Sequence, residues 1–238
     1  MIPPIVILDS PQLGENIGFT ARAMLNCGLK ELRLVSPRDG WPNPAALAAA
    51  AGAGGVIECA KVFGCRYDVI SDCHRVYAAT ARRREQIKRI LSPRAAAAEV
   101  KAIRGDVQTG ILFGPERSGL DNDAVALADA VIEVPMNSEF NSLSLPQAVL
   151  LIAYDWRMAD EAAGAEIRSF GDLASKEKLL HFFTRLEAAL DDSGFFHVNE
   201  KRPSMVRNIR NIFQRSSLTE QEVSTLQGII TSLSRRDS

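Results

Sequence analysis

The chain has 238 residues, of which 46 % are hydrophobic and 24 % charged, a composition typical of a folded globular protein and not of a disordered one. No apolar run approaches the roughly 20 residues of a membrane-spanning helix, and the apolar N-terminal stretch has no basic leader, so we expect neither a membrane protein nor a signal peptide. The net charge of −1 gives no global sign of a nucleic-acid-binding protein, so any such contact depends on local clusters.

Short apolar runs and helical patterns alternate through the first two thirds of the chain. Apolar runs predict strands at residues 5–8, 32–35, 62–63, 74–78, 111–113 and 131–134, and Val56 is also typical of a strand. Helical spacing predicts helices over residues 19–27, 45–51, 93–103 and 146–163. Strands that alternate with helices predict an α/β fold with a mainly parallel sheet flanked by helices.

The pattern changes after Gly164, where charged helical segments follow without strands. Apolar residues between 179 and 190 keep helical spacing, and Thr219 with Glu222 forms the signature of a capping box that opens a last helix. We therefore expect two units, a sheet domain over residues 1–164 and a small all-helical C-terminal extension over residues 165–238.

Cysteine and histidine usage argues against a disulfide framework and against a metal site. The four cysteines show no C-x-x-C spacing, which in a chain of this size without an export signal indicates reduced thiols and a cytoplasmic location. The three histidines, His74, His181 and His197, do not pair at ligand spacing, so no metal is expected.

Two glycine-rich stretches, at residues 52–55 and 114–119, lack the glycine spacing of a dinucleotide or P-loop site. Two polar loops that follow predicted strands point to a different kind of site. The first holds Asn16 and Gly18, with Arg22 one helical turn later, and Asn16 can cap the helix that follows. The second reads Phe-Gly-Pro-Glu-Arg-Ser-Gly-Leu over residues 113–120.

A third polar loop, within residues 134–145, again separates a strand from an apolar helix, with Ser142 and Ser144 as candidate caps. Ligands of open α/β sheets bind at the carboxyl ends of the strands. Three polar loops after three strands therefore predict a ligand site at that edge.

These loops resemble the three ordered motifs of the SpoU/TrmH branch of the SPOUT methyltransferases: Asn-x-Gly-x-x-x-Arg, Phe-Gly-x-Glu-x-x-Gly-Leu, and Ser-Leu before a helix. Within the branch the chain is most similar to the TrmJ type, and the similarity spans nearly its whole length. The segments that carry this similarity are residues 21–24, 51–53, 79–82, 182–190, 194–195 and 226–229. The chain departs from the family where Ser144 stands at a usual asparagine and Pro146 at a usually small residue.

The resemblance implies a SPOUT fold, in which the C-terminal part of the sheet domain is threaded into a deep trefoil knot, a rare exception to the rule against threading. It also implies S-adenosylmethionine as the methyl donor, S-adenosylhomocysteine as the product, and no metal. The residues that match the family's donor contacts are Ala79, Thr80, Ala81, Gly114, Val134, Asn141, Ser142 and Leu143.

The implied reaction methylates a ribose 2′-hydroxyl of tRNA, at nucleotide 32 for the TrmJ type, and the matching catalytic positions are Arg22, Ser142, Asn16 and Glu116. Because a guanidinium with a pKa above ~12 is a poor base, we expect Arg22 to bind the target phosphate and ribose oxygen. Ser142 would orient the hydroxyl or the arginine, and Asn16 and Glu116 would hold the loops. The family acts as a homodimer in which Arg22 of one subunit faces the donor of the other, so a single chain would lack a complete site.

Two local clusters of positive charge fit an RNA partner. Residues 82–94 contain six basic residues and one acidic residue, and residues 201–215 contain five basic residues and no acidic one. Local excess of this kind is what phosphate docking requires. The expected RNA-binding residues are Arg82, Arg84, Lys201, Arg202, Arg207 and Arg210.

Two other functions stay open at this point. A methyltransferase acting on rRNA would differ only in its substrate. A non-catalytic RNA-binding scaffold of the same fold gains support from the departures at Ser144 and Pro146.

Overall fold

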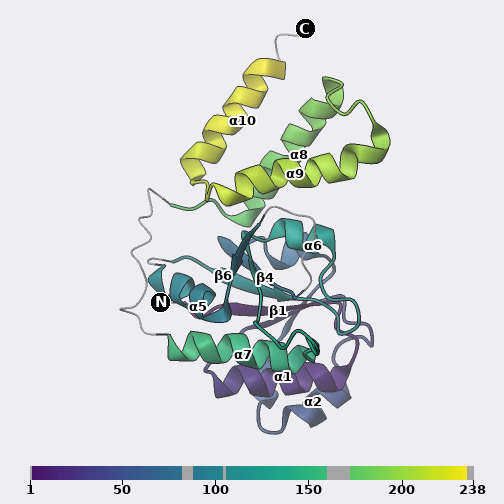
Figure 1. Ribbon diagram of the computed structural model, residues 1–238, viewed down its shortest axis with the longest axis vertical. Coiled ribbons are helices and arrows are strands. Elements are labelled where there is room, and N and C mark those ends of the chain that lie inside the picture. The colour runs from purple at the N-terminus through teal and green to yellow at the C-terminus, as the bar shows by residue number, and fades with distance from the viewer. Residues whose placement is uncertain (1, 82–87, 104–105, 160–171, 235–238) are drawn as a thin grey trace.

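A computed structural model describes residues 2–81, 88–103, 106–159 and 172–234 of the chain (Figure 1). Its centre is one parallel sheet of seven strands in the order β3-β2-β1-β6-β4-β7-β5. The strands are β1 (Ile5–Asp9), β2 (Leu32–Val35), β3 (Lys61–Phe63), β4 (Arg75–Ala79), β5 (Arg89–Leu91), β6 (Thr109–Phe113) and β7 (Ala130–Ile132). The central strands β1 and β6 are buried along their whole length, which explains why they are continuous apolar runs in the sequence.

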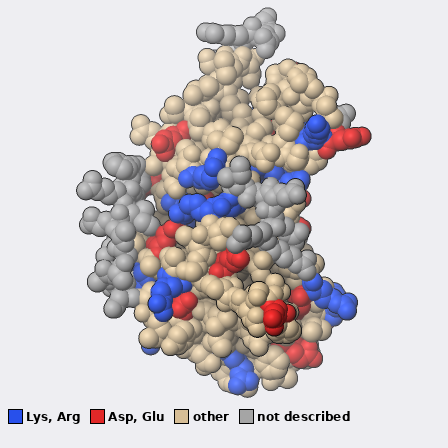
Figure 2. Space-filling model, in the orientation of Figure 1, with Lys and Arg blue, Asp and Glu red and all other residues tan. Residues whose placement is uncertain are grey.

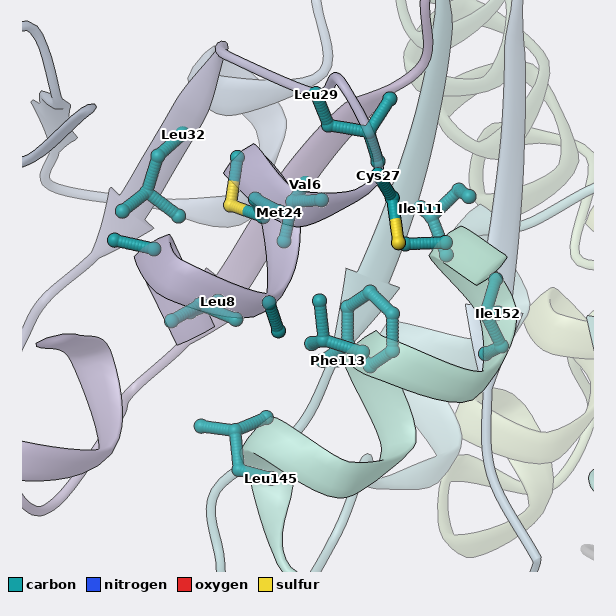
Figure 3. Close-up of a cluster of buried hydrophobic side chains, with 14 of the residues drawn as sticks. Val6, Leu8, Met24, Cys27, Leu29, Leu32, Ile111, Phe113, Leu145 and Ile152 are labelled. Atoms are coloured by element: carbon teal, nitrogen blue, oxygen red, sulfur yellow. The ribbon is translucent and has the colours of Figure 1, made fainter. Parts of the chain in front are cut away.

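Helices cover both faces of the sheet (Figure 1). The side chains of a strand alternate between the two layers. One face packs against α1 (Gly14–Asn26), α2 (Pro44–Ala50), α3 (Gly54–Glu58), α5 (Pro93–Ala102) and α7 (Leu145–Met158). The other face packs against the shorter helices α4 (Arg66–Val69) and α6 (Asn122–Leu127). Figure 3 shows the first of these layers, in which Val6 and Leu8 of β1 meet Met24 of α1.

The helical extension, whose described part is residues 172–234, consists of α8 (Lys176–Asp192), the short 3₁₀ helix η1 (Asn199–Lys201), α9 (Arg202–Arg215) and α10 (Glu220–Ser234). It has a small core of its own, in which the ring of Phe213 packs edge-on against Phe182 at 5.0 Å between centroids. Helix α9 lies against α6, so the extension is stacked on the face of the sheet opposite α1 and α7 (Figure 1).

The expected fold class is confirmed: a parallel sheet flanked by helices is followed by an all-helical extension. The predicted capping box is also present, because the Thr219 N–H donates to Oε2 of Glu222 at 2.7 Å and the Glu222 N–H donates to the Thr219 hydroxyl at 3.2 Å. The trefoil knot stays an expectation from the resemblance. Among the described residues, no helix is long and apolar enough to cross a membrane.

Several predicted boundaries differ from the structure. Val56 lies in α3 and not in a strand, and the helix predicted from residue 19 begins at Gly14. The strand β5 and the helices α4, α6 and α9 were not predicted. The predicted boundary between residues 164 and 165 lies outside the described residues, so the division into two domains stays a prediction.

Candidate active site

A cavity of about 430 Å³ lies where the neighbouring strands β6, β4 and β7 reach their carboxyl ends. Its walls come from the ends of these strands, from the three loops that follow them, and from the first turns of α7. Parallel strands bring loops that are far apart in the sequence to one edge of the sheet.

All eight residues that the resemblance assigns to the methyl donor line this cavity. They are Ala79, Thr80, Ala81, Gly114, Val134, Asn141, Ser142 and Leu143. Part of the remaining wall was not predicted from the sequence. Leu145, Ala148 and Ile152 belong to it, and their spacing on one face of α7 is a signal that helical periodicity could have revealed.

The loop after β6 is shaped by its glycines. A Cβ atom on Gly114 would lie 2.3 Å from the backbone nitrogen of Leu120, so only glycine fits there. Gly119 has a φ of +64°, and its N–H donates to the Pro115 carbonyl at 2.8 Å. The loop therefore folds back on itself and presents Glu116 near its tip.

Glu116 joins this loop to the start of α1. Its carboxylate accepts hydrogen bonds from the backbone N–H of Gln12 at 2.9 Å, from that of Leu13 at 3.3 Å, and from the side-chain amide of Asn16 at 2.9 Å. A carboxylate at a helix N-terminus satisfies free N–H groups and interacts favourably with the helix dipole. Glu116 therefore caps α1 from a position about 100 residues further along the chain.

The prediction that Asn16 is the N-cap of this helix is wrong. Leu13 occupies the N-cap position, and Asn16 lies inside the first turn of α1. Gly18 has a packing role, since a Cβ atom there would lie 2.3 Å from the Ala46 carbonyl oxygen of α2.

Arg22 does not line the cavity. It is exposed on α1 and borders a second, shallower hollow of about 240 Å³ between α1 and α7. The other residues around this hollow are Phe19, Ala23, Asn26, Pro146, Gln147 and Leu150. Within one chain, the structure therefore brings Asn16 and Glu116 together and places Ser142 in the cavity, but it leaves Arg22 on a separate surface.

The two departures from the family pattern are accommodated at the start of α7. Ser144 is the N-cap of α7, and its N–H donates to Oε1 of Gln147 at 2.9 Å as part of a capping box. Pro146 lies in the first turn, where its missing N–H has no helical partner to lose. Of the two candidate caps, Ser144 is confirmed, whereas Ser142 lies in the loop before the helix.

The first basic cluster is only partly described, because Arg82 and Arg84 lie outside the described residues. Lys88 is not a phosphate ligand on the surface. Its ammonium group donates to the carbonyl oxygens of Ala126 at 3.1 Å and Ala128 at 2.6 Å, and burial lowers its pKa to about 7. Lys88 is one of the six basic residues counted in this segment, so less of the segment's positive charge is available to RNA than the count alone suggests.

The second basic cluster is largely engaged in ion pairs. Arg202 pairs with Asp191 and Arg207 with Asp123, while Arg210 pairs with Glu187 at 2.7 Å in a mostly buried contact. Lys201 is exposed. Figure 2 shows Lys and Arg side chains gathered across the middle of the visible face, where the extension meets the sheet domain. Positive charge is therefore present here, but part of it is neutralised within the chain.

Among the described residues, no group of three or more His, Cys, Asp or Glu side chains is arranged to hold a metal ion. None of the four cysteines forms a disulfide.

Two family models match the chain. Residues 3–154 match the SpoU rRNA Methylase family, and residues 177–238 match the C-terminal domain of the tRNA methyltransferase TrmJ. Together these matches cover the sheet domain and nearly all of the described extension.

Relatives and solved structures are similar over nearly the full length. The tRNA (cytidine/uridine-2′-O-)-methyltransferase TrmJ of Sodalis glossinidius is 34 % identical, covering 96 % of this chain and 90 % of that protein. The tRNA (cytidine/uridine/adenosine-2′-O-)-methyltransferase TrmJ of Pseudomonas aeruginosa is 31 % identical, covering 95 % and 91 %. The crystal structure of TrmJ from Z. mobilis superposes with a TM-score of 0.90 at 44 % identity, covering 98 % of this chain and 100 % of that one.

Proposed function

The chain belongs to the SpoU rRNA methylase family, and from this premise we propose that it transfers a methyl group from S-adenosylmethionine to a ribose 2′-hydroxyl of tRNA, at nucleotide 32 of the anticodon loop. The observation that carries the proposal is the cavity at the carboxyl ends of β4, β6 and β7, which gathers every residue assigned to the donor. The relatives named as tRNA 2′-O-methyltransferases, similar over nearly the whole chain, support tRNA as the substrate.

The cavity fits S-adenosylmethionine in size and in lining. A volume of about 430 Å³ is within the range of small-molecule sites. Ala79, Ala81 and Gly114 are small, so backbone groups can reach the donor. Thr80, Asn141 and Ser142 add polar side chains to the wall, and Glu116 and Arg117 add charged ones. When bound, the donor supplies an electrophilic methyl group and leaves as S-adenosylhomocysteine.

The chain's own residues position the acceptor. A guanidinium presents several N–H donors that match phosphate oxygens, so Arg22 binds the phosphate and the ribose oxygen of the target nucleotide. Ser142, in the cavity wall, orients the 2′-hydroxyl or the arginine. Asn16 and Glu116 hold the first two motif loops together through their 2.9 Å hydrogen bond. Holding two reactants in line within about 3–3.5 Å supplies a large part of the rate enhancement in such reactions.

We further propose that two copies share each site. Arg22 lies on a surface of α1 and α7 whose large apolar side chains are exposed in the single chain, with Tyr154 at 54 % and Met158 at 62 %. Phe19, Leu150 and Leu151 extend this surface. Contiguous exposed apolar surface of this kind marks a protein interface. A second copy seated on it would bring its own cavity, at the start of its α7, toward Arg22.

The helical extension is the proposed tRNA-binding unit, and the division into residues 1–164 and 165–238 belongs to this proposal. Its basic residues are Lys201, Arg202, Arg207 and Arg210, with Arg82 and Arg84 added from the sheet domain. The match of residues 177–238 to the C-terminal domain of TrmJ, a tRNA methyltransferase, favours tRNA over rRNA as the substrate. The alternative of a non-catalytic RNA-binding scaffold was supported by the departures from the family pattern at Ser144 and Pro146. Because both residues are accommodated at the start of α7, these departures no longer favour it. The cytoplasm is the proposed location.

The test is product mapping with the purified protein. We expect ribose methylation of a tRNA transcript in the presence of S-adenosylmethionine, confined to nucleotide 32 in a mass-spectrometric digest, and donor binding by calorimetry. Methylation of rRNA fragments alone would establish the rRNA alternative. Absence of donor binding would establish the non-catalytic scaffold.

A further inference from the structure

A buried ion pair outside the cavity joins the extension to the sheet domain. The Lys176 side chain is 1 % exposed, and its ammonium group donates to Oδ1 of Asp129 at 2.7 Å and to Oε1 of Gln214 at 2.7 Å. Asp129 precedes β7, Lys176 begins α8, and Gln214 lies near the end of α9. The three side chains therefore connect three separate elements in one buried polar cluster, which we call the junction cluster.

The junction cluster also reaches the backbone of the sheet. The second carboxylate oxygen of Asp129 accepts a hydrogen bond from the N–H of Val76 in β4 at 2.7 Å. The side-chain amide of Gln214 points to the Leu127 carbonyl at 3.5 Å. Both oxygens of Asp129 and the side-chain carbonyl of Gln214 thus have partners, which is the condition under which a buried charge is tolerated.

Helix α8, which carries Lys176, does not itself stabilise a positive charge at this position. Lys176 is the first residue of α8, whose N-cap is Ser175. A positive charge at a helix N-terminus opposes the helix dipole, and a buried ammonium loses its hydration. Asp129, on the other unit, is the group that compensates both effects, so the placement of Lys176 makes physical sense only with the extension docked.

Further contacts fix the same docking. The N–H of Lys176 donates to the Cys73 carbonyl at 2.8 Å, and the N–H of Glu177 donates to the Ser71 carbonyl at 3.1 Å. Arg75 donates to the Ser217 hydroxyl at 2.7 Å. These contacts hold the start of α8 and the end of α9 at once, so the extension cannot pivot on a single point.

The docking determines where α9 lies relative to the cavity. Arg207 in the middle of α9 pairs with Asp123 of α6 at 3.0 Å. Helix α6 begins two residues after Leu120, the end of the loop that carries Gly114 and Glu116 in the cavity wall. The basic residues of α9 are therefore held at a fixed distance from the edge of the sheet where the cavity opens.

We propose that Lys176 is a positioning residue for tRNA: the junction cluster of Lys176, Asp129 and Gln214 sets the orientation of the extension so that its basic residues and the cavity engage one tRNA together. This rests on the proposed function. Because Lys176 is buried, it cannot touch RNA, and its removal acts only through the placement of the extension.

Comparing Lys176→Met with a matched control distinguishes the loss of the docked position of the extension from the loss of one positive charge. Lys178→Met removes a lysine two residues away on the same helix, where Lys178 is half-exposed and pairs with Glu220 inside the extension. For Lys176→Met we expect the KM for tRNA to rise by about tenfold or more, while kcat at saturating tRNA and the Kd for S-adenosylmethionine stay within about threefold. For Lys178→Met we expect all three to match the wild type.

Hydrogen exchange gives a readout that does not depend on activity. The amides of Lys176 and Glu177 donate across the junction, so their exchange should accelerate in Lys176→Met while amides of β1 and β6 stay protected. If the single variant fails to fold, Lys176→Met with Asp129→Asn leaves no unpaired buried charge and still offers Val76 an acceptor, and the same rise in KM is expected.

Three outcomes would overturn the proposal. They are faster exchange at the junction with an unchanged KM for tRNA, an equal rise in KM for Lys178→Met, and a joint fall in kcat and donor affinity. These outcomes can be distinguished from a failure of the proposed function, because in that case the wild-type protein would transfer no methyl group to tRNA.

Discussion

Glu116 concentrates three hydrogen bonds on one carboxylate, at the point where the loop after β6 meets the start of α1. In Glu116→Gln, the side chain keeps one acceptor oxygen and turns an N–H group toward donors that it used to satisfy. We expect the free energy of unfolding to fall by about 1–3 kcal/mol, and donor binding to weaken because Glu116 also lines the cavity.

Urea unfolding and calorimetry with S-adenosylmethionine measure the two effects. Asp39→Asn is the matched control, since Asp39 loses its charge beside Arg38 in an exposed pair, and its free energy of unfolding should stay close to that of the wild type. A stability for Glu116→Gln equal to that of the wild type would contradict the capping role.

Lys88 makes the stability of the fold depend on pH. Burial, aided by Lys176 and Arg215 and opposed by Asp129, lowers its pKa from 10.5 to about 7. Between these two values the unfolded chain holds a proton that the folded chain does not, so folded stability rises with pH across this window. Relative to Lys88→Met, the wild type should gain on the order of 2–4 kcal/mol in free energy of unfolding as the pH rises from 7 to above 10.

Urea unfolding of the wild type and of Lys88→Met at several pH values measures the difference. The exposed Lys30→Met serves as the control and should show no such trend against the wild type. A difference between wild type and Lys88→Met that does not change with pH would mean that Lys88 titrates normally.

At the scale of elements, the start of α7 connects local helix capping to the cavity. The capping box of Ser144 and Gln147 fixes the turn at which the loop of Asn141, Ser142 and Leu143 enters the helix. Its side-chain half, in which the Ser144 hydroxyl accepts from the Gln147 N–H, is lost in alanine. Ser144→Ala should cost about 1 kcal/mol of stability and weaken donor binding, whereas Ser144→Asn, which restores the family residue, keeps a good N-cap and should leave both unchanged.

Thermal unfolding and donor calorimetry on this pair of variants provide the check. If Ser144→Asn raises kcat well above the wild type, the serine is a functional departure and not merely an alternative cap. Equal behaviour of the alanine and asparagine variants would show that the cap does not shape the loop.

Some strands and helix ends follow from local sequence patterns, and others do not. The buried strands β1, β2, β4 and β6 are apolar runs in the sequence, so their position and the α/β class were predictable. The start of α1 was not, because its capping group is Glu116, about 100 residues away. The strand β5 is short, lies at the sheet edge and carries exposed side chains, so no apolar run marks it.

In the candidate site, the cavity residues were more predictable from the sequence than the surroundings of the basic residues. The residues that the resemblance assigns to the donor lie at or after the ends of β4, β6 and β7, and the parallel sheet brings these ends together at one edge. The basic residues of α9 were identified by charge alone. Charge along a sequence cannot reveal that Arg210 is paired with Glu187, because that partner lies on another helix.

At the scale of the whole molecule, the proposed second copy would account for the separation of Arg22 from the cavity. The hollow at Arg22 is bordered by Pro146, Gln147 and Leu150 of α7, the helix that begins at Leu145, shortly after Ser142. In a twofold dimer the same surface patch of both subunits meets, so each arginine can face the other subunit's cavity. A charge at Leu150 should split such a dimer, and Leu150→Asp is expected to be monomeric by light scattering and inactive.

Mixing of subunits tests the shared site directly. Arg22→Ala and Ser142→Ala homodimers should each be nearly inactive, since every site lacks one of the two groups. After the two variants are unfolded together and refolded in equal amounts, half of the dimers are mixed. One of the two sites in each mixed dimer then joins the intact Arg22 of one subunit to the intact Ser142 of the other, so activity should return to about a quarter of the wild type. If both groups acted within one chain, every site in the mixture would still carry a defect, and methyl transfer to tRNA would stay at the level of the separate variants.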